Sequence, residues 1–182
     1  MREAEKITVI EAVNEARVTI ESGLRMELIP EVGSNLCYSI ESPANEADIA
    51  GFTGRIVRDL GRPRIVGYAK FGASKHVARI ILAASRHDAS IRSALNIKYN
   101  ARNLEACKKA GLSMSSFSRE NEPEGVSTMD WGTDQAIKRF GSVPDAIWDA
   151  GGHGKEPMIR ILGKDPQDVL AKMIRMANQL EK

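Results

Sequence analysis

Helical and strand-like patterns alternate along this chain, and one pair of strands is joined by a tight turn. Residues 3–22 repeat apolar side chains at helical spacing, starting with Ile7, and the pattern ends at Gly23. Residues 51–71 are predicted to form a hairpin, because two strand-like runs flank a turn at residues 60–63. A hairpin pairs its strands in antiparallel fashion, whereas helices between strands allow parallel pairing. The alternation therefore predicts an α/β fold with a mixed sheet.

The rest of the chain divides into short elements separated by turn residues. Residues 34–40 alternate polar and apolar side chains, which predicts a strand. Asp130 is expected to cap the helix that follows it. The other expected elements, in chain order, are helices at 74–87, 90–95 and 103–110, a strand at 112–117, the capped helix up to residue 140, strands at 146–148 and 158–162, and a last helix at 165–180.

The composition is that of one globular domain. The chain has 182 residues, of which 42% are hydrophobic and 27% charged, and this argues against disorder or a coiled-coil rod. We expect a single domain over residues 1–182, with an amphipathic helix at 1–26 and a core at 27–182. No apolar run is long enough to span a bilayer and the start lacks a secretion signal, which predicts a cytoplasmic protein without membrane partners. Cys37 and Cys107 lack the close spacing of a metal or redox pair, so we expect both to be buried.

The basic charge is concentrated in the middle of the chain. Residues 54–109 contain thirteen Lys and Arg and three acidic residues, a net charge of +10, whereas the rest of the chain carries −8. This asymmetry indicates an anionic partner, either a phosphorylated small molecule or a nucleic acid. Aromatic residues are only 5% of the chain, so stacking platforms for single-stranded nucleic acid are scarce. A phosphorylated small molecule is therefore the favoured partner, and nucleic-acid binding the disfavoured one.

The segment at residues 71–79 has the features of an anion site. A turn of Gly72 and Ala73 leads to Ser74, which is expected to cap a helix whose first N–H groups attract an anion. Lys75, His76 and Arg79 then supply further donors, and His76 and Arg79 share one helix face. The alternative is an ordinary capped surface helix with solvated basic residues.

Residues 151–157 form a second candidate, a glycine-rich loop after a strand that ends at Asp149. Its three glycines allow backbone N–H groups to approach a ligand closely, and Lys155 would stand beside a bound phosphate. The glycine spacing is not that of a Walker A loop. The alternative is a flexible turn, in which His153 is merely exposed.

Gly54 and Arg55 form a third candidate, since glycine in a strand can mark a close approach and arginine presents a planar fork to phosphate. Most arginines on an outer strand are solvated, so this pair alone is weak support for a site.

The sequence contains no nucleophile elbow, no His-Glu-x-x-His helix and no Rossmann fingerprint. The chemistry is therefore expected to depend on anion binding, as in a transfer that releases pyrophosphate.

Five segments in the same order resemble the ThiN-type thiamine-phosphate synthase domain, an archaeal family often found behind a hydroxymethylpyrimidine phosphate kinase. The segments lie at residues 28–35, 51–57, 71–79, 96–99 and 151–157, and the resemblance runs from about residue 27 to the C-terminus. It implies a three-layer α/β/α fold with a mixed sheet, similar to class II (AraD-like) aldolases. The aldolase zinc site is not implied, because His76, His87 and His153 are the only histidines.

The resemblance implies a transferase that condenses hydroxymethylpyrimidine pyrophosphate with hydroxyethylthiazole phosphate to give thiamine phosphate and pyrophosphate. It places Arg55 and His76 as catalytic donors to the pyrophosphate, with Mg²⁺ bridging pyrophosphate oxygens. Metal ligands are not assigned. The substrate-binding residues expected on this basis are Gly33, Ser34, Asn35, Gly54, Gly72, Ala73, Ser74, Lys75, Arg79, Asn96, Lys98, Asp149, Gly151, Gly152, His153, Gly154 and Lys155.

Two other functions stay open. The same pocket could sense thiamine phosphate for a regulator without turnover, although the first 26 residues have room for only one helix and not for a DNA-binding domain. A nucleic-acid-binding domain would instead use the basic stretch and bind with steep salt dependence. By analogy with related folds we also expect a homodimer formed through apolar helices.

Overall fold

The computed structural model describes residues 2–180, so both ends of the predicted 1–182 domain lie outside the described residues. The helices are α1 (Arg2–Gly23), α2 (Lys75–Ser85), α3 (Ala101–Lys109), α4 (Thr128–Phe140) and α5 (Pro166–Ala177), with short 3₁₀ turns η1 (Met26–Leu28), η2 (Glu46–Asp48) and η3 (Arg119–Asn121). The strands are β1 (Leu36–Ser39), β2 (Ile49–Phe52), β3 (Ile56–Asp59), β4 (Arg62–Ile65), β5 (Ala69–Phe71), β6 (Ser93–Lys98), β7 (Met114–Ser116), β8 (Ala146–Asp149) and β9 (Met158–Gly163).

Seven strands form one sheet in the order β5-β2-β1-β6-β9-β8-β7. The β7–β8 pair is parallel and the other neighbours are antiparallel, which confirms the predicted mixed sheet. Arg160 of β9 is opposite both Asn96 of β6 and Ile147 of β8. Residues directly opposite in a sheet point to the same face, so these three side chains lie on one side.

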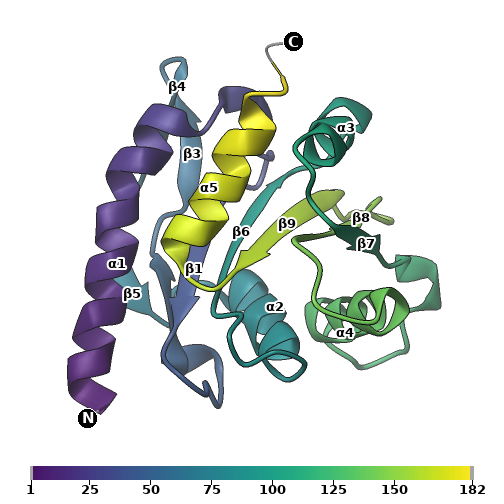
Figure 1. The fold of residues 1–182 in the computed structure, drawn as a ribbon, viewed down its shortest axis with the longest axis horizontal. Helices are drawn as coiled ribbons and strands as arrows, with labels where there is room; N and C mark the ends of the chain where they lie inside the picture. Colours follow the sequence, from purple (N-terminus) through teal and green to yellow (C-terminus); the bar gives the residue numbers. More distant parts are fainter. Residues whose placement is uncertain (1, 181–182) are drawn as a thin grey trace.

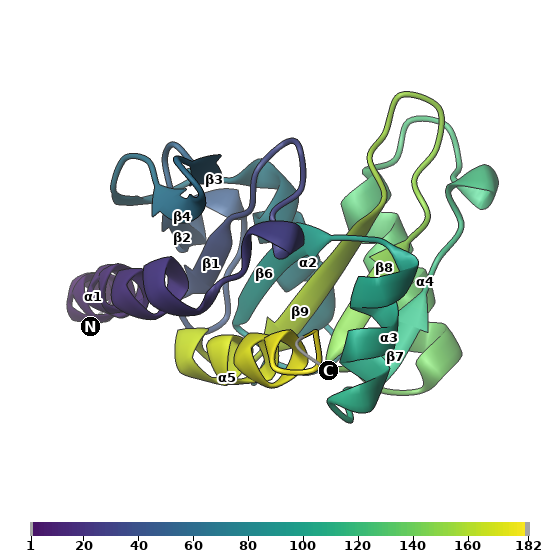
Figure 2. The ribbon, with the colours of Figure 1, turned by 90° about the horizontal axis from the view of Figure 1, so that it is seen from above.

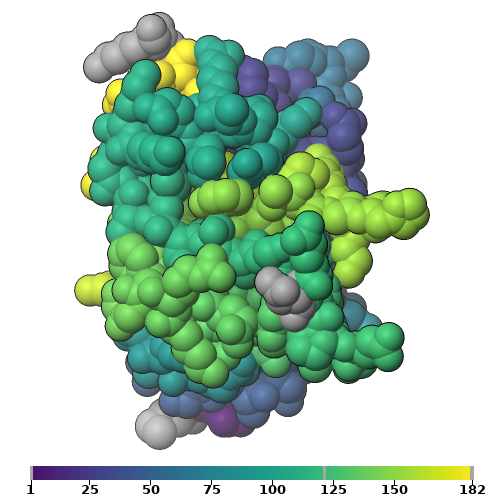
Figure 3. Space-filling model, turned by 90° about the vertical axis from the view of Figure 1, so that its right-hand side faces the viewer, coloured from purple at the N-terminus to yellow at the C-terminus, as the bar shows by residue number. Residues whose placement is uncertain are grey.

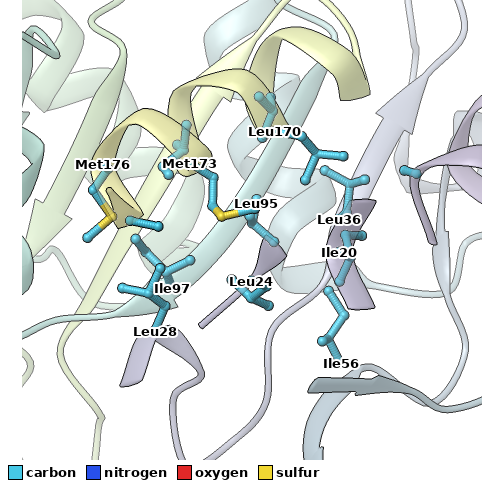
Figure 4. Close-up of a cluster of buried hydrophobic side chains, with 14 of the residues drawn as sticks. Ile20, Leu24, Leu28, Leu36, Ile56, Leu95, Ile97, Leu170, Met173 and Met176 are labelled. Carbon is cyan, nitrogen blue, oxygen red and sulfur yellow. The ribbon is translucent and has the colours of Figure 1, made fainter. Parts of the chain in front are cut away.

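Helices cover both faces of the sheet (Figures 1 and 2), which confirms the predicted three layers. α1, α3 and α5 share one hydrophobic cluster with the sheet, and α2 and α4 share a second cluster with its other face. Figure 4 shows the first cluster, where Leu170, Met173 and Met176 of α5 lie over Leu95 and Ile97 of β6. The second face carries the candidate site.

The predicted hairpin at residues 51–71 is present in two parts. Its outer strands, β2 and β5, pair within the large sheet, while β3 and β4 form a separate two-stranded sheet. This small sheet is held against α1, because Arg17 donates to the carbonyl oxygen of Gly67 at 2.9 Å and Glu21 accepts from the N–H of Ile65 at 3.1 Å. The arrangement leaves the connection between β2 and β3, which carries Arg55, at the end of the sheet.

The helix predicted at residues 90–95 is wrong, because this segment leads into β6, a central strand. Residues 93–97 are buried. A short apolar run is compatible with either a buried strand or a buried helix, so hydrophobic periodicity could not distinguish the two structures.

Two predicted helix details also need correction. α4 begins at Thr128 with Ser127 at its N-cap position, so Asp130 lies in the first turn and does not cap the helix. Ile7 is 60% exposed, whereas the buried side of α1 is formed further along by Val9, Val13, Ala16 and Ile20.

Cys37 and Cys107 are buried, as predicted, and burial raises the pKa of both thiols to about 12. Both therefore behave as small apolar side chains. Within residues 2–180, no helix combines the length and apolar character needed to cross a membrane.

Candidate active site

Two adjoining cavities open where α2 and α4 begin. Cavity A has a volume of about 600 Å³ and cavity B about 490 Å³. They share Val32, Lys75, His76 and Met158 as a common wall, so they form two halves of one cleft. Cavity A is lined by Val32, Gly33, Ser34, Asn35, Arg55, Gly72, Ala73, Ser74, Lys75, His76, Val77, Asn96 and Met158. Cavity B is lined by Val32, Lys75, His76, Arg79, Arg119, Ser127, Thr128, Met129, Gly154, Lys155, Glu156 and Met158.

Cavity A therefore brings together segments that are far apart in the sequence and that were each predicted to bind substrate. The two predicted catalytic residues, Arg55 and His76, line this same cavity. Cavity B brings the predicted residues Arg79, Gly154 and Lys155 beside them.

Arg55 reaches cavity A from the connection between β2 and β3, with its backbone in the left-handed region at φ 67°. Its Nη1 donates a hydrogen bond to the carbonyl oxygen of Val32. Gly33 lies directly against the Arg55 side chain, since a Cβ on Gly33 would be 3.4 Å from both Cβ and Cδ of Arg55 and 3.1 Å from the carbonyl oxygen of Ile56. Gly33 thus keeps room for Arg55 at the edge of the cavity.

The N-terminus of α2 forms another wall of cavity A. Ser74 caps this helix as predicted, because its hydroxyl accepts a hydrogen bond from the N–H of Val77 at 3.4 Å. The first N–H groups of a helix lack intrahelical acceptors and carry partial positive charge. Lys75 and His76 lie in that first turn, so backbone and side-chain donors converge on the same space.

His76 is held neutral in this environment. Burial, followed by the positive charges of Arg160, Arg119 and Arg55, lowers the pKa of His76 to about 4, and Asp149 opposes this only in part. Its Nε2 is buried and has no hydrogen-bond partner among the described residues. The imidazole therefore sits beside positive charges that a bound anion would balance.

Ser34 carries a second unpartnered polar atom of cavity A. The residue is fully buried, and its hydroxyl oxygen has no hydrogen-bond partner among the described residues. Such an atom is costly to bury unless a ligand or water satisfies it.

Asn35 and Asn96 line cavity A, but their polar groups are engaged with the protein. The amide of Asn35 pairs with the backbone of Phe52 at 2.8 and 2.9 Å, as a neighbouring strand would. Asn96 accepts from the N–H of Asn35 at 2.7 Å and donates to the carbonyl oxygen of Gly33 at 3.1 Å. Their geometry indicates that they shape the loop carrying Gly33 and Ser34.

Asp149 lies beneath the cleft and lines neither cavity. It is fully buried and forms ion pairs with Nε of Arg119 and Nη1 of Arg160, both at 2.6 Å. Burial alone would raise the pKa of Asp149, but Arg160 and Arg119 outweigh it and lower that pKa. Arg160 is also fully buried, and its Nε and Nη2 have no hydrogen-bond partners among the described residues. The three groups keep a net positive charge next to His76.

The glycine-rich loop between β8 and β9 is tied across the cleft by Glu156. Its carboxylate accepts hydrogen bonds from the N–H groups of Glu31, at 2.9 Å, and Val32, at 3.2 Å. Figures 2 and 3 show this yellow-green loop projecting from the same side of the molecule as the green segment that precedes α4. Lys155 reaches toward that segment and the start of α4, with its Nζ 3.6 Å from the carboxylate of Glu122 and 3.4 Å from the hydroxyl of Thr128.

Five further predicted residues lie outside both cavities. Gly54 makes a close approach, as predicted for glycine in a strand, but the approach is to Val66, whose carbonyl oxygen would be 2.7 Å from a Cβ at Gly54. Lys98 is paired with Glu31 at 3.6 Å. The other three are in the glycine-rich loop: Gly151, Gly152 and the exposed His153.

Comparison with known proteins identifies the family. The sequence matches the family described as Thiamine-phosphate synthase ThiN over residues 12–175. The chain belongs to the ThiN family. This confirms the predicted resemblance, which had rested on motifs spread between residues 28 and 157.

Two archaeal relatives of this ThiN chain carry names from thiamine biosynthesis. It is 49% identical over 151 residues to the bifunctional thiamine biosynthesis protein ThiDN of Methanocaldococcus jannaschii, covering 82% of this chain but 36% of that protein. It is 37% identical over 154 residues to the thiamine-phosphate synthase ThiN of Methanothermobacter thermautotrophicus, covering 82% of this chain and 81% of that protein. The ThiN chain thus spans about a third of the length of the first relative and most of the second.

Solved structures agree with the fold of this ThiN domain. The crystal structure of the C-terminal domain of a phosphomethylpyrimidine kinase matches it with a TM-score of 0.90 at 38% identity, over 94% of this chain and 100% of that chain. The L-fuculose 1-phosphate aldolase of Glaciozyma antarctica matches with a TM-score of 0.53 at 13% identity, over 100% of this chain and 74% of that chain. The second match concerns the fold alone and confirms the predicted aldolase-like architecture.

The sequence motifs missed several residues of the ThiN cleft. Arg119 lines cavity B, yet its partner Asp149 is thirty positions away, so no local pattern marks it. Ser127 and Thr128 lie at the true start of α4, which the predicted cap at Asp130 had placed two or three residues later. Met158 contributes an apolar surface to both cavities, and nothing in the strand pattern distinguishes it from a core residue.

Proposed function

We propose that this domain is a thiamine-phosphate synthase. It would join hydroxymethylpyrimidine pyrophosphate to hydroxyethylthiazole phosphate and release pyrophosphate. The observation that carries the proposal is that Arg55, His76 and the N-terminus of α2 line one cavity. The Methanothermobacter thermautotrophicus relative supports it, because that protein is named a thiamine-phosphate synthase and the match covers 81% of it.

The reaction needs little from the protein in the way of acid–base chemistry. The thiazole nitrogen has a free lone pair, so it attacks the pyrimidine methylene carbon without a general base. The carbon–oxygen bond to the pyrophosphate breaks, and its electron pair stays on the departing oxygen. Stabilising that developing charge is therefore the main task of the site.

Cavity A is suited to this task. Arg55 offers a planar fork of donors, and Lys75 adds a second positive charge. The imidazole of His76, neutral before substrate binds, would donate a hydrogen bond to the pyrophosphate. Bound pyrophosphate raises the pKa of such an imidazole, so His76 is also the group placed to protonate the leaving group.

Mg²⁺ belongs to the proposal as a companion of the pyrophosphate. Within residues 2–180, no group of three His, Cys, Asp or Glu side chains could hold a metal ion. An ion in the cleft would therefore be coordinated mainly by phosphate oxygens and water, which is the usual mode for Mg²⁺. It would neutralise part of the pyrophosphate charge.

The test is to incubate the protein with both substrates and Mg²⁺ and to measure thiamine phosphate and pyrophosphate. Formation of both products in equal amounts supports the synthase. Tight binding of thiamine phosphate without any turnover would instead support the sensor that the sequence left open.

A further inference from the structure

We propose that cavity B binds the phosphate monoester of the thiazole substrate and that Arg119 is a substrate-binding residue there. The inference rests on the proposed function and deepens it, because it assigns one substrate to each half of the cleft. Arg119 was not among the residues that the sequence motifs indicated.

Cavity B has its own set of anion donors, separate from those around Arg55. Ser127, Thr128 and Met129 at the start of α4 line it, and α4 is thirteen residues long. Its first N–H groups favour a negative charge at this end. Arg119 and Lys155 add positive side chains to the same wall. The cleft thus contains two helix N-termini with basic side chains, and the reaction has two phosphorylated substrates.

Arg119 is held ready for a ligand. Its side chain is only 10% exposed, and its Nε and Nη2 both donate to Asp149, at 2.6 and 3.4 Å. Asp149 is fixed in turn by Arg160. This leaves Nη1 as the guanidinium nitrogen of Arg119 that has no acceptor among the described residues. A side chain locked in this way loses little conformational freedom when a phosphate binds.

The balance of charge decides which substrate each cavity takes. Three cations that line cavity B alone are already paired, since Arg79 binds Glu46 at 2.7 Å, Lys155 lies 3.6 Å from Glu122, and Arg119 binds Asp149. Lys75 lines both cavities and so does not distinguish them. Cavity A has no carboxylate in its lining. Pyrophosphate carries more negative charge than a monoester, so it is favoured in cavity A.

Shared residues explain how the two substrates could meet. Val32, His76 and Met158 border both cavities. With a pyrophosphate on one side and a monoester on the other, the two heterocycles would approach along this shared, partly apolar wall. The thiazole nitrogen would then face the pyrimidine methylene carbon from the side opposite the leaving group.

The experiment measures the binding of hydroxyethylthiazole phosphate alone by calorimetry and the KM of each substrate. The variants are Arg119→Lys, which keeps the charge but loses the fork, and Lys155→Ala, which lies on an exposed loop and is expected to fold normally. Arg175→Ala on α5 is the control, because Arg175 is exposed on the other face of the sheet. We expect about tenfold weaker binding or more for the two cavity B variants, the effect of losing a charged hydrogen bond, and no change for the control.

The kinetic result must be selective. The KM for the thiazole phosphate is expected to rise in both variants, while the KM for the pyrimidine pyrophosphate stays within twofold of the parent. Unchanged binding of the thiazole phosphate, or a larger rise in the KM for the pyrimidine pyrophosphate, overturns the assignment. A parent protein that forms no thiamine phosphate refutes the proposed function instead, and the calorimetry then still tests cavity B.

Discussion

Replacing Gly33 with alanine is expected to have two effects, backbone strain and displacement of the Arg55 side chain, and comparison with a matched glycine separates them. Gly33 and Gly61 have nearly the same backbone conformation, with φ values of 81° and 80°. A Cβ on Gly61 would meet nothing within 4 Å, whereas a Cβ on Gly33 would lie 3.1 Å from the carbonyl oxygen of Ile56 and 3.4 Å from two carbons of Arg55. Gly61→Ala is therefore the matched control for Gly33→Ala.

The two variants are expected to differ in function more than in stability. A left-handed conformation costs alanine about 1 to 2 kcal/mol, and both variants lose that much unfolding free energy. Gly33→Ala loses about 1 to 3 kcal/mol more of unfolding free energy if Arg55 and the carbonyl group of Ile56 cannot move, since this is the range for overpacking. If Arg55 moves instead, the added loss is smaller and the guanidinium leaves its place in cavity A.

Urea unfolding and the rate of thiamine phosphate formation measure the two effects. We expect kcat to fall by about 100-fold in Gly33→Ala, the typical effect of losing one donor to developing charge, and to stay unchanged in Gly61→Ala. Equal kcat values for the two alanine variants, with both folded, would show that Gly33 does not position Arg55 for catalysis.

Three further perturbations test the charges beneath the cleft. Asp149→Asn leaves Arg119 and Arg160 without their shared carboxylate and is expected to cost about 3 to 5 kcal/mol of unfolding free energy. The control, Asp130→Asn in an exposed pair with Arg86, should cost less than about 1 kcal/mol, and similar urea midpoints for the two variants would contradict the buried network. Because the pKa of His76 falls from 6.5 to about 4 on folding, the unfolded chain binds a proton at His76 at higher pH than the folded chain does, so the free energy of unfolding should decline as pH drops from about 6.5 to 4. In acid titrations of stability, His76→Gln should lack this part of the decline. Adding inorganic pyrophosphate should raise the pKa of His76 in an NMR titration of its imidazole, and an unchanged pKa would place the anion elsewhere.

The parts of the site that the sequence predicted are those built from local patterns. Ser74 follows a glycine turn and precedes an apolar helical repeat, so the start of α2 and the position of His76 were readable from neighbouring residues. Arg55 was a weak candidate from its place beside Gly54, and the family resemblance added Gly33 and the catalytic role of Arg55. The structure explains the pairing of Gly33 and Arg55 by a contact between residues twenty-two positions apart.

The parts that the sequence did not predict depend on contacts across the sheet. The first half of β6 was mistaken for a helix because its burial on both faces comes from layers formed by distant segments. Arg119 lines cavity B and Arg160 lies beneath the cleft, and both are held in place by Asp149, which lies on a different strand from Arg160 and on a different segment from Arg119. Asp149 itself was predicted to bind substrate, but its complete burial indicates a supporting role.

The most direct test of the central claim is the single-turnover rate of thiamine phosphate formation by Arg55→Ala, measured beside its urea midpoint. Arg55 lines cavity A and has no ion pair among the described residues, so its loss should barely affect folding. We predict a rate about 100 to 1,000 times slower than that of the parent protein at an almost unchanged midpoint. A variant that forms thiamine phosphate as fast as the parent would contradict the claim that the pyrophosphate departs from cavity A.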